Sequence, residues 1–411
     1  MIKNTDKIKN TKGIIVLLLI LACHTNIKAQ SATDKKFMVS IDSLNTLMYT
    51  ELNKHNYQSA EEFCREMVNL YDLQASQLSE VYAYFKYLGY YIMACLQAKQ
   101  GKNKEAVANL VKVLDSGKME ISYNQIMNNA DLSGILDEKV LQPALKRLKA
   151  NTDYLQILKD APEYSNTSQN GDMPRIIYER ADNPDLVLVR EYFKLDSVAV
   201  KGDEISTIKR ILTYIHDKIR HDGQHGTPSG GANSLNYAEA CKDGSRGLNC
   251  RGLATVLNEC YLSMGIPSRV ITCLPKTYIV DCHVINAVYS STLKKWLWID
   301  PTNNAWVTDD RGNMLSVQEV RDRLRSGQPV LVNKDANWNN EKKTTTEAYL
   351  YEYMAKNLFY IEGWTRYGFN TESDKDNPVN YIFLQPAGCK SDQMKPKNIS
   401  VNDDQLYWQA P

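Results

Sequence analysis

The chain has 411 residues, which is enough for two or three domains, and its 43% hydrophobic and 24% charged content is ordinary for a globular protein. Its 49 basic and 48 acidic residues leave a formal net charge of +1, so charge predicts no nucleic-acid partner and no membrane-surface partner.

Residues 1–29 have the pattern of an export signal. Lysines make the start basic, and Gly13–Ala22 is an apolar stretch too short to span a bilayer. Small-residue cleavage after Ala29 is the favoured ending. The alternative is a lipoprotein signal ending before Cys23, which would then carry lipid. Either ending predicts a periplasmic or extracellular protein, attached to a membrane only if Cys23 is lipidated.

Residues 31–160 are predicted to be helical throughout. Apolar side chains recur at three- and four-residue spacing in three segments, Asn56–Tyr71, Tyr84–Gln97 and Gly101–Leu114. The small residues Ala94 and Ala106 flank the turn at Gly101, as closely packed helix pairs require. This pairing resembles tetratricopeptide repeats, although the spacing is longer than the usual repeat. The resemblance implies a docking module for a protein partner, and a plain helical bundle is the alternative.

A polar linker at Ser165–Gly171 precedes the second predicted domain, residues 172–332. Asp182–Asp196 is expected to be a capped helix or an extended approach. Glu204–Arg220 is a clear amphipathic helix. The Gly-rich stretch His221–Ala232 that follows is interpreted as a mobile wall of a cleft.

Three histidines in this region, His216, His221 and His225, raise the question of a metal site. No Cys, Asp or Glu completes a familiar zinc spacing with them, so we expect neither a metal nor another cofactor.

The stretch that organises the second domain is a helix that begins at Cys250. Asn249 is a good N-cap and Gly247 provides a turn before it, while Gly265 and Pro267 end the helix. Unpaired N–H groups and the positive end of the helix dipole therefore surround the thiol. That setting lowers a thiol pKa and favours the nucleophilic thiolate.

A nucleophilic cysteine needs a base and an orienting group. His283 is the sole histidine after Cys250, and it lies in Ile279–Val288, a segment of strand character. A turn leads to a second strand that ends at Asp300, with Trp296 and Trp298 on the same face. Two antiparallel neighbours of this kind can bring the imidazole and the carboxylate together beside the thiol.

These residues resemble the transglutaminase-like superfamily, a branch of the papain-like thiol enzymes. The matching motifs are Gly247, Asn249 and Cys250 at a helix start, Gly265–Arg269 at its end, Asp281-Cys282-His283 on a strand, and Trp298–Thr302. The resemblance covers roughly 205–324. It implies Cys250 as nucleophile, His283 as base and then acid, and Asp300 as orienter. The implied architecture is multidomain, with a tetratricopeptide-like α-helical domain before an α+β papain-like domain.

The expected function is that of an exported thiol enzyme that acts on an amide bond of a peptide or protein through a thioester acyl-enzyme. The Cys250 N–H is one candidate oxyanion donor, and Asn236 and Tyr237 are candidates for a second. The polar approach to Cys250 and the Gly-rich loop favour a peptidase or amidase, because they would admit water. The alternatives are a protein-cross-linking transglutaminase and a non-catalytic interaction protein that docks partners on its helical domain.

Residues 333–411 are expected to be a C-terminal extension packed on the core. Among the nine cysteines, Cys95 and Cys260 are interpreted as small buried hydrophobes. Removal of the export signal leaves an odd number besides Cys250. Cys273 and Cys282 flank a predicted hairpin and are the pair to test for a disulfide bridge.

Overall fold

The computed structural model describes residues 32–165, 173–199, 202–277 and 281–411. The predicted export signal, including Cys23, and most of the predicted linker lie outside the described residues. The chain divides into two compact units, Met1–Asp153 and Tyr154–Pro411. Within the described ranges, no helix is both long enough and apolar enough to cross a membrane.

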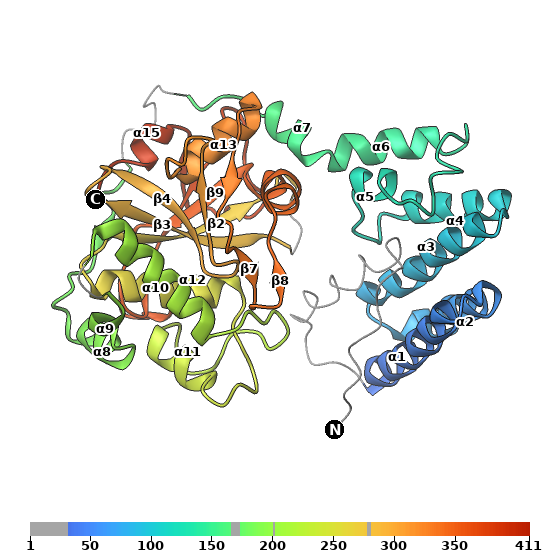
Figure 1. Ribbon diagram of the computed structural model, residues 1–411, viewed down its shortest axis with the longest axis horizontal. Helices are drawn as coiled ribbons and strands as arrows, with labels where there is room; N and C mark the ends of the chain where they lie inside the picture. Colours follow the sequence, from blue (N-terminus) through green and yellow to red (C-terminus); the bar gives the residue numbers. More distant parts are fainter. Residues whose placement is uncertain (1–31, 166–172, 200–201, 278–280) are drawn as a thin grey trace. The chain divides into compact units, whose positions relative to one another are not determined.

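The first unit is helical (Figure 1). Its α-helices are α1 (Ala32–Asn53), α2 (Tyr57–Gln74), α3 (Ala83–Lys99), α4 (Asn103–Ser116), α5 (Tyr123–Met127) and α6 (Gln142–Thr152). The first four helices pack in sequence, α1 against α2, α2 against α3 and α3 against α4. Ala94 and Ala106 are fully buried where α3 meets α4, so the small residues allow the close approach that their positions predict.

A buried polar network also joins α2, α3 and α4. Gln97 donates from Nε2 to Glu61 Oε1 at 2.8 Å and accepts at Oε1 from Asn109 Nδ2 at 2.9 Å. Lys102 completes the network with a 3.3 Å contact to Glu61 Oε2. A buried polar group is costly unless it is paired, so these bonds fix the register of three helices.

The second unit is a mixed α/β domain. Its helices are α7 (Tyr154–Lys159), α8 (Pro184–Tyr192), α9 (Leu195–Ala199), α10 (Glu204–Lys218), α11 (Ser234–Ala240), α12 (Cys250–Ser263), α13 (Val317–Ser326), α14 (Ala355–Asn357) and α15 (Asp404–Tyr407). Its strands are β1 (Ile177–Tyr178), β2 (Ser268–Leu274), β3 (His283–Ser290), β4 (Lys295–Asp300), β5 (Ala305–Thr308), β6 (Leu331–Val332), β7 (Asn337–Trp338), β8 (Lys342–Lys343), β9 (Tyr360–Trp364), β10 (Arg366–Tyr367), β11 (Tyr381–Leu384) and β12 (Ile399–Val401).

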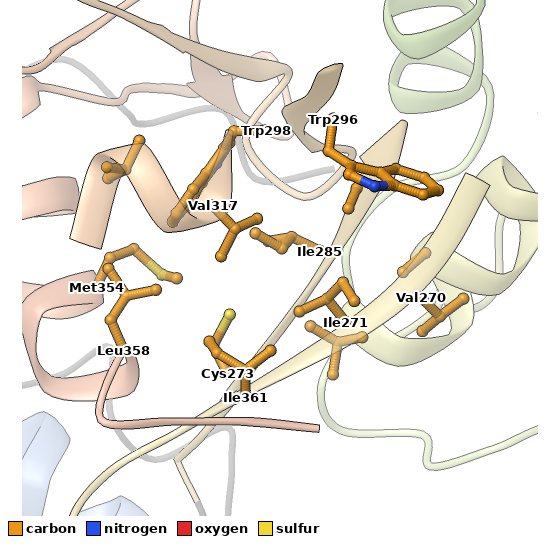
Figure 2. Packing of buried hydrophobic residues seen from close by; sticks show 14 of the residues in the cluster. Val270, Ile271, Cys273, Ile285, Trp296, Trp298, Val317, Met354, Leu358 and Ile361 are labelled. Atoms are coloured by element: carbon orange, nitrogen blue, oxygen red, sulfur yellow. The ribbon is translucent and has the colours of Figure 1, made fainter. Parts of the chain in front are cut away.

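The main sheet has eight strands in the order β12-β11-β9-β2-β3-β4-β5-β6. Figure 1 shows α10, α11 and α12 on one side of this sheet and α13 on the other. Leu297 and Ile299 of β4 belong to the core beneath α12. Trp296 and Trp298 belong to the opposite core, where Figure 2 shows them beside Val317 and Ile285. The alternation predicted for this strand is therefore confirmed, with one face on each core.

Residues 333–411 supply three strands of the main sheet, because β9 pairs with β2 and β11 lies between β9 and β12. The polar segment 334–343, which has no clear pattern in the sequence, forms the β7–β8 hairpin. The Tyr-rich segment that follows begins as a π-helix, Glu347–Met354, and continues through α14 into β9.

One buried cation connects this C-terminal region to β2. Arg269 donates to the backbone oxygens of Tyr407 at 2.7 Å and Gln409 at 3.2 Å, and its guanidinium lies 4.2 Å from the ring centroid of Trp296. Tyr178 accepts a third hydrogen bond from Arg269 Nε at 2.6 Å. An unpaired buried charge costs several kcal/mol. The stable packing of β2 therefore requires residues 407–409, whose backbone oxygens accept from Arg269.

Candidate active site

Cys250 is the first residue of α12, and it is partly exposed. Asn249 caps the helix, with Oδ1 accepting the Gly252 N–H at 2.9 Å, as its position predicts. Farther along the helix, Asn286 of β3 donates from Nδ2 to the Ala254 oxygen at 3.0 Å. The cap fixes where the helix begins, and the Asn286 bond fixes the helix against the strand that carries His283.

The antiparallel registers bring His283 and Asp300 together. His283 is the first residue of β3 and lies opposite Cys273 of β2, while Asp300 is the last residue of β4. Both side chains are buried, and His283 Nε2 lies 2.8 Å from Asp300 Oδ2. The other ring nitrogen is left for the Cys250 thiol, so the three predicted site residues form one constellation.

Three further groups hold the Asp300 carboxylate. Oδ2 accepts hydrogen bonds from the Tyr349 hydroxyl at 2.5 Å and from Asn303 Nδ2 at 3.0 Å, and Oδ1 accepts the Thr302 N–H at 2.8 Å. Burial raises the pKa of Asp300, but the His283 charge and these hydrogen bonds outweigh burial and keep it below its ordinary value. Asp300 is therefore an ionised and well-oriented partner for the imidazole.

The protonation of the thiol and the imidazole follows from these contacts. Burial raises the pKa of Cys250, but hydrogen bonds from His221 and His283, together with the charge of His283, lower it to about 6. Burial lowers the pKa of His283, whereas the charge and hydrogen bond of Asp300 raise it to about 10. Between these values the site holds a thiolate beside an imidazolium, the activated form of a cysteine nucleophile.

The π-helix supplies two tyrosines that the sequence analysis did not assign to the site. Tyr349 and Tyr353 both meet the His283 ring edge-on, at centroid distances of 6.3 and 5.4 Å. Tyr353 also donates to Asp281 Oδ1 at 3.1 Å, and Lys356 pairs with Asp281 Oδ2 at 2.5 Å. The repeated Tyr in 349–353 is a visible signal, but the sequence does not show that a π-helix aims both rings at one histidine.

His221 is a further residue near the thiol that the sequence does not assign to the site. The sequence places it in a predicted mobile wall, yet its imidazole lowers the pKa of the Cys250 thiol. Its loop is held in several places: Asp222 accepts the Gly247 N–H at 3.1 Å, and Arg246 donates to the Gly226 oxygen at 2.7 Å. Nothing local in the sequence signals that residues 220–222 run beside 247–249.

The two proposed oxyanion residues lie on α11. Asn236 uses its side-chain amide within the preceding loop, donating to the backbone oxygens of Ser229 and Gly231, both at 2.8 Å. Tyr237 is buried in the core beneath α12. The contacts of these side chains thus serve the loop and the core.

The remaining histidines and the proposed cysteine pair have other surroundings. His216 donates from Nδ1 to the Pro301 oxygen at 2.9 Å, and His225 Nδ1 lies 2.6 Å from Asp222 Oδ2. No cluster of His, Cys, Asp and Glu side chains suited to a metal occurs in the part of the chain that the structure describes. Cys273 and Cys282 are both free thiols, so the structure does not contain the bridge considered between them.

Comparison with known proteins finds a family match in the part of the chain that contains these three site residues. Residues 194–301 match the model of the transglutaminase-like superfamily, a stretch that includes Cys250, His283 and Asp300. The chain therefore contains a transglutaminase-like domain, preceded by a helical region, and this is the kind of domain found in thiol enzymes. No curated protein matches the chain.

Among solved structures, the chain is similar to one described as a "Putative Cysteine Protease" from Cytophaga hutchinsonii. The two sequences are 15% identical, the match covers 44% of this chain and 59% of that chain, and the TM-score is 0.23. The chain thus spans less than two thirds of that protein. With a TM-score this low, the family match is the comparison that bears on function.

Proposed function

We propose that the protein is a cysteine hydrolase that cleaves amide bonds of peptides or proteins, with Cys250, His283 and Asp300 as its catalytic triad. The observation that carries the proposal is the thiol at the start of α12, beside an imidazole whose far nitrogen is bonded to a buried carboxylate. The lowered pKa of Cys250, about 6, supports a thiolate at neutral pH.

The proposed reaction has two halves. The Cys250 sulfur attacks the amide carbonyl carbon, the carbon–nitrogen bond breaks, and His283 gives its proton to the leaving amine. His283 then takes a proton from water, whose oxygen attacks the thioester carbon. The carbon–sulfur bond breaks, the carboxylic acid leaves, and Cys250 returns to the thiolate beside protonated His283. Asp300 keeps the imidazole in one orientation and stabilises its charge through both halves.

Water is favoured over an amine as the second reactant because the approach to the thiol is polar. Lys242, Asp243 and Ser245 are exposed just ahead of Cys250. The next residue after the thiol, Arg251, pairs with Glu372 at 2.8 Å and donates to Thr272 Oγ1 at 3.0 Å. A cross-linking enzyme must let an amine win against bulk water, which needs a dry acceptor site.

The test is a mixture of amino-blocked glutamine-containing peptides, incubated with the protein with and without dansylcadaverine and read by mass spectrometry. We expect new carboxyl groups at the same rate in both samples, and no product from the Cys250→Ala variant. Incorporation of dansylcadaverine well above hydrolysis would instead support a cross-linking transglutaminase.

A second measurement on the same samples distinguishes an enzyme from a non-catalytic binding protein. If neither product forms and Cys250 carries no thioester adduct in the intact mass, the amide-hydrolase proposal fails. Cys250→Ala then serves as the control for partner capture by the helical unit, which a binding module would retain.

A further inference from the structure

Two imidazoles, those of His283 and His221, lower the pKa of the Cys250 thiol. His221 is brought next to the segment ahead of Cys250 by a short backbone pairing. Residues after α10 run parallel to the segment ahead of Cys250: the Asp222 N–H donates to the Leu248 oxygen at 2.7 Å, and the Leu248 N–H donates to the Arg220 oxygen at 3.1 Å. A Cβ on Gly247 would lie 2.2 Å from that Arg220 oxygen. Glycine is therefore required for His221 to reach the thiol.

The β7–β8 hairpin fixes both the backbone and the ring of His221. Asn339 accepts the His221 N–H at Oδ1, 2.6 Å away, and donates from Nδ2 to the His221 oxygen at 3.0 Å. Trp338 donates its indole N–H to His221 Nδ1 at 3.2 Å. An indole can only donate, so Nδ1 must present its lone pair and the ring hydrogen must lie on Nε2.

The two imidazoles therefore have opposite partners. His283 faces a carboxylate, an acceptor that favours the protonated ring. His221 faces a donor that occupies the lone pair a base would need. Only its Nε2–H is left for the Cys250 thiol. His283 can move a proton, whereas His221 can offer an N–H and nothing else.

We propose that His221 is the side-chain donor of the oxyanion hole, acting with the backbone N–H of Cys250. The inference rests on the proposed acylation of Cys250. When the sulfur–carbon bond forms, the carbonyl π electrons move to oxygen, and the negative charge passes from sulfur to that oxygen. The Nε2–H shifts its hydrogen bond with the charge, and no proton leaves His221. The Cys250 N–H is available because the first N–H of a helix has no acceptor within it.

Asn236, the side-chain donor that the sequence suggested, is less suited to this role. Both of its amide hydrogens are used by the backbone oxygens of Ser229 and Gly231. His221 is the polar side chain, besides His283, that lowers the pKa of the thiol through a hydrogen bond.

Two reagents distinguish stabilisation of an oxyanion by His221 from a mere lowering of the thiol pKa by His221. Iodoacetamide alkylates sulfur without forming an oxyanion, while p-nitrophenyl acetate transfers its acetyl group through one. The rates of both reactions at Cys250 are measured for each variant at the plateau of its own pH profile, where the thiol is fully ionised. For His221→Ala we expect the acetylation rate to fall by about 10²-fold and the alkylation rate to change less than about threefold.

Two more variants keep the test interpretable. His221→Gln retains an N–H donor and should recover most of the acetylation rate. Trp338→Phe removes the indole N–H that keeps the His221 hydrogen on Nε2, and it should lower the acetylation rate by a smaller factor. Equal losses in both reactions, or full acetylation in His221→Ala, would overturn the oxyanion role. If the wild-type protein is not acetylated at Cys250, or if Cys250→Ala still turns over the ester, the proposed function itself fails.

Discussion

The cysteines of the helical unit and Cys250 of the sheet unit show how neighbouring side chains set the pKa of a thiol. Cys64 and Cys95 lie within buried helices. Burial raises the pKa of Cys95 to about 12, although Asn129 Nδ2 donates to its sulfur at 3.5 Å, and burial raises the pKa of Cys64 further. At Cys250 burial acts in the same direction, yet hydrogen bonds from His221 and His283 outweigh it. Neutral donors do not overcome burial at Cys95, whereas the imidazoles and the charge of His283 do so at Cys250.

The largest effect is expected from deleting the reactive thiol. Cys250→Ala should lower hydrolysis of p-nitrophenyl acetate by about 10⁴-fold or more, because Cys250 is partly exposed and two imidazoles lower its pKa. Cys260→Ala is the matched control on the same helix, and Cys95→Ala is the control in the helical unit. Both should retain the wild-type rate, and a comparable loss in either would break the comparison.

Replacing the carboxylate comes next. Asp300→Asn should lower turnover by about 10²–10⁴-fold, because an amide at this position can turn a hydrogen toward His283 Nε2 and stabilises the imidazolium poorly. The thiol pKa should rise from about 6, since a neutral His283 lowers it less. Alkylation of Cys250 by iodoacetamide across pH measures the shift. An unchanged midpoint would mean that Asp300 does not act through His283.

The pH profile of the wild-type protein tests directly whether Cys250 ionises at lower pH than an ordinary thiol. Cys250 has a lowered pKa and His283 a raised one, so the thiolate–imidazolium pair forms as pH rises through about 6 and is lost as pH rises through about 10. The rate constant kcat/KM should follow a bell with those limbs. Alkylation of Cys250 should have its midpoint near pH 6, against about 8.5 for an ordinary thiol. A midpoint near 8.5 would contradict the site electrostatics.

A smaller effect is expected from Tyr349→Phe. The ring keeps its edge-on contact with His283, but Asp300 loses one of its hydrogen-bond donors. We expect a threefold to tenfold loss in kcat/KM, corresponding to about 0.7–1.4 kcal/mol. Tyr351→Phe on the same π-helix is the control, and equal losses in the two variants would point to general disruption of that helix.

The smallest effect on the site is expected from the helical unit. Gln97→Ala removes the centre of the network that joins Glu61 and Asn109. It should lower the free energy of unfolding by about 1–3 kcal/mol and leave the alkylation of Cys250 unchanged. Thermal unfolding and the alkylation rate are measured on the same sample, with Lys104→Ala as a surface control. A slower alkylation would show that the two units are coupled.

Much of the fold could be predicted because its signals are local. The apolar stripe and the caps placed α12 and α10 nearly to the residue, with Cys250 opening its helix as expected. The alternation in β4 placed the two tryptophans on one face and ended the strand at Asp300. Periodicity and capping act over a few residues, so they can be read without knowing the tertiary structure.

The residues that hold His221 and Asp300 in place could not be predicted from local patterns, because they come from segments distant in the sequence. Trp338 reaches His221 and Tyr349 reaches Asp300 only after the chain has folded. The segment that carries Trp338 is polar and only two residues of it pair in each strand, so its pattern is indistinguishable from a loop. The π-helix likewise has no signature in propensity, and tertiary packing selects it.

The Arg269 contact has a consequence for the order of events in synthesis. Cys250 and β2 are made well before Tyr407 and Gln409, whose backbone oxygens accept from this guanidinium. Until those residues have been translated, the Arg269 cation of β2 lacks these two backbone acceptors, and β2 lacks its neighbour β9. A nascent chain therefore holds its thiol in an unfinished site, and the reactive cysteine is assembled only after the C-terminal region has been made.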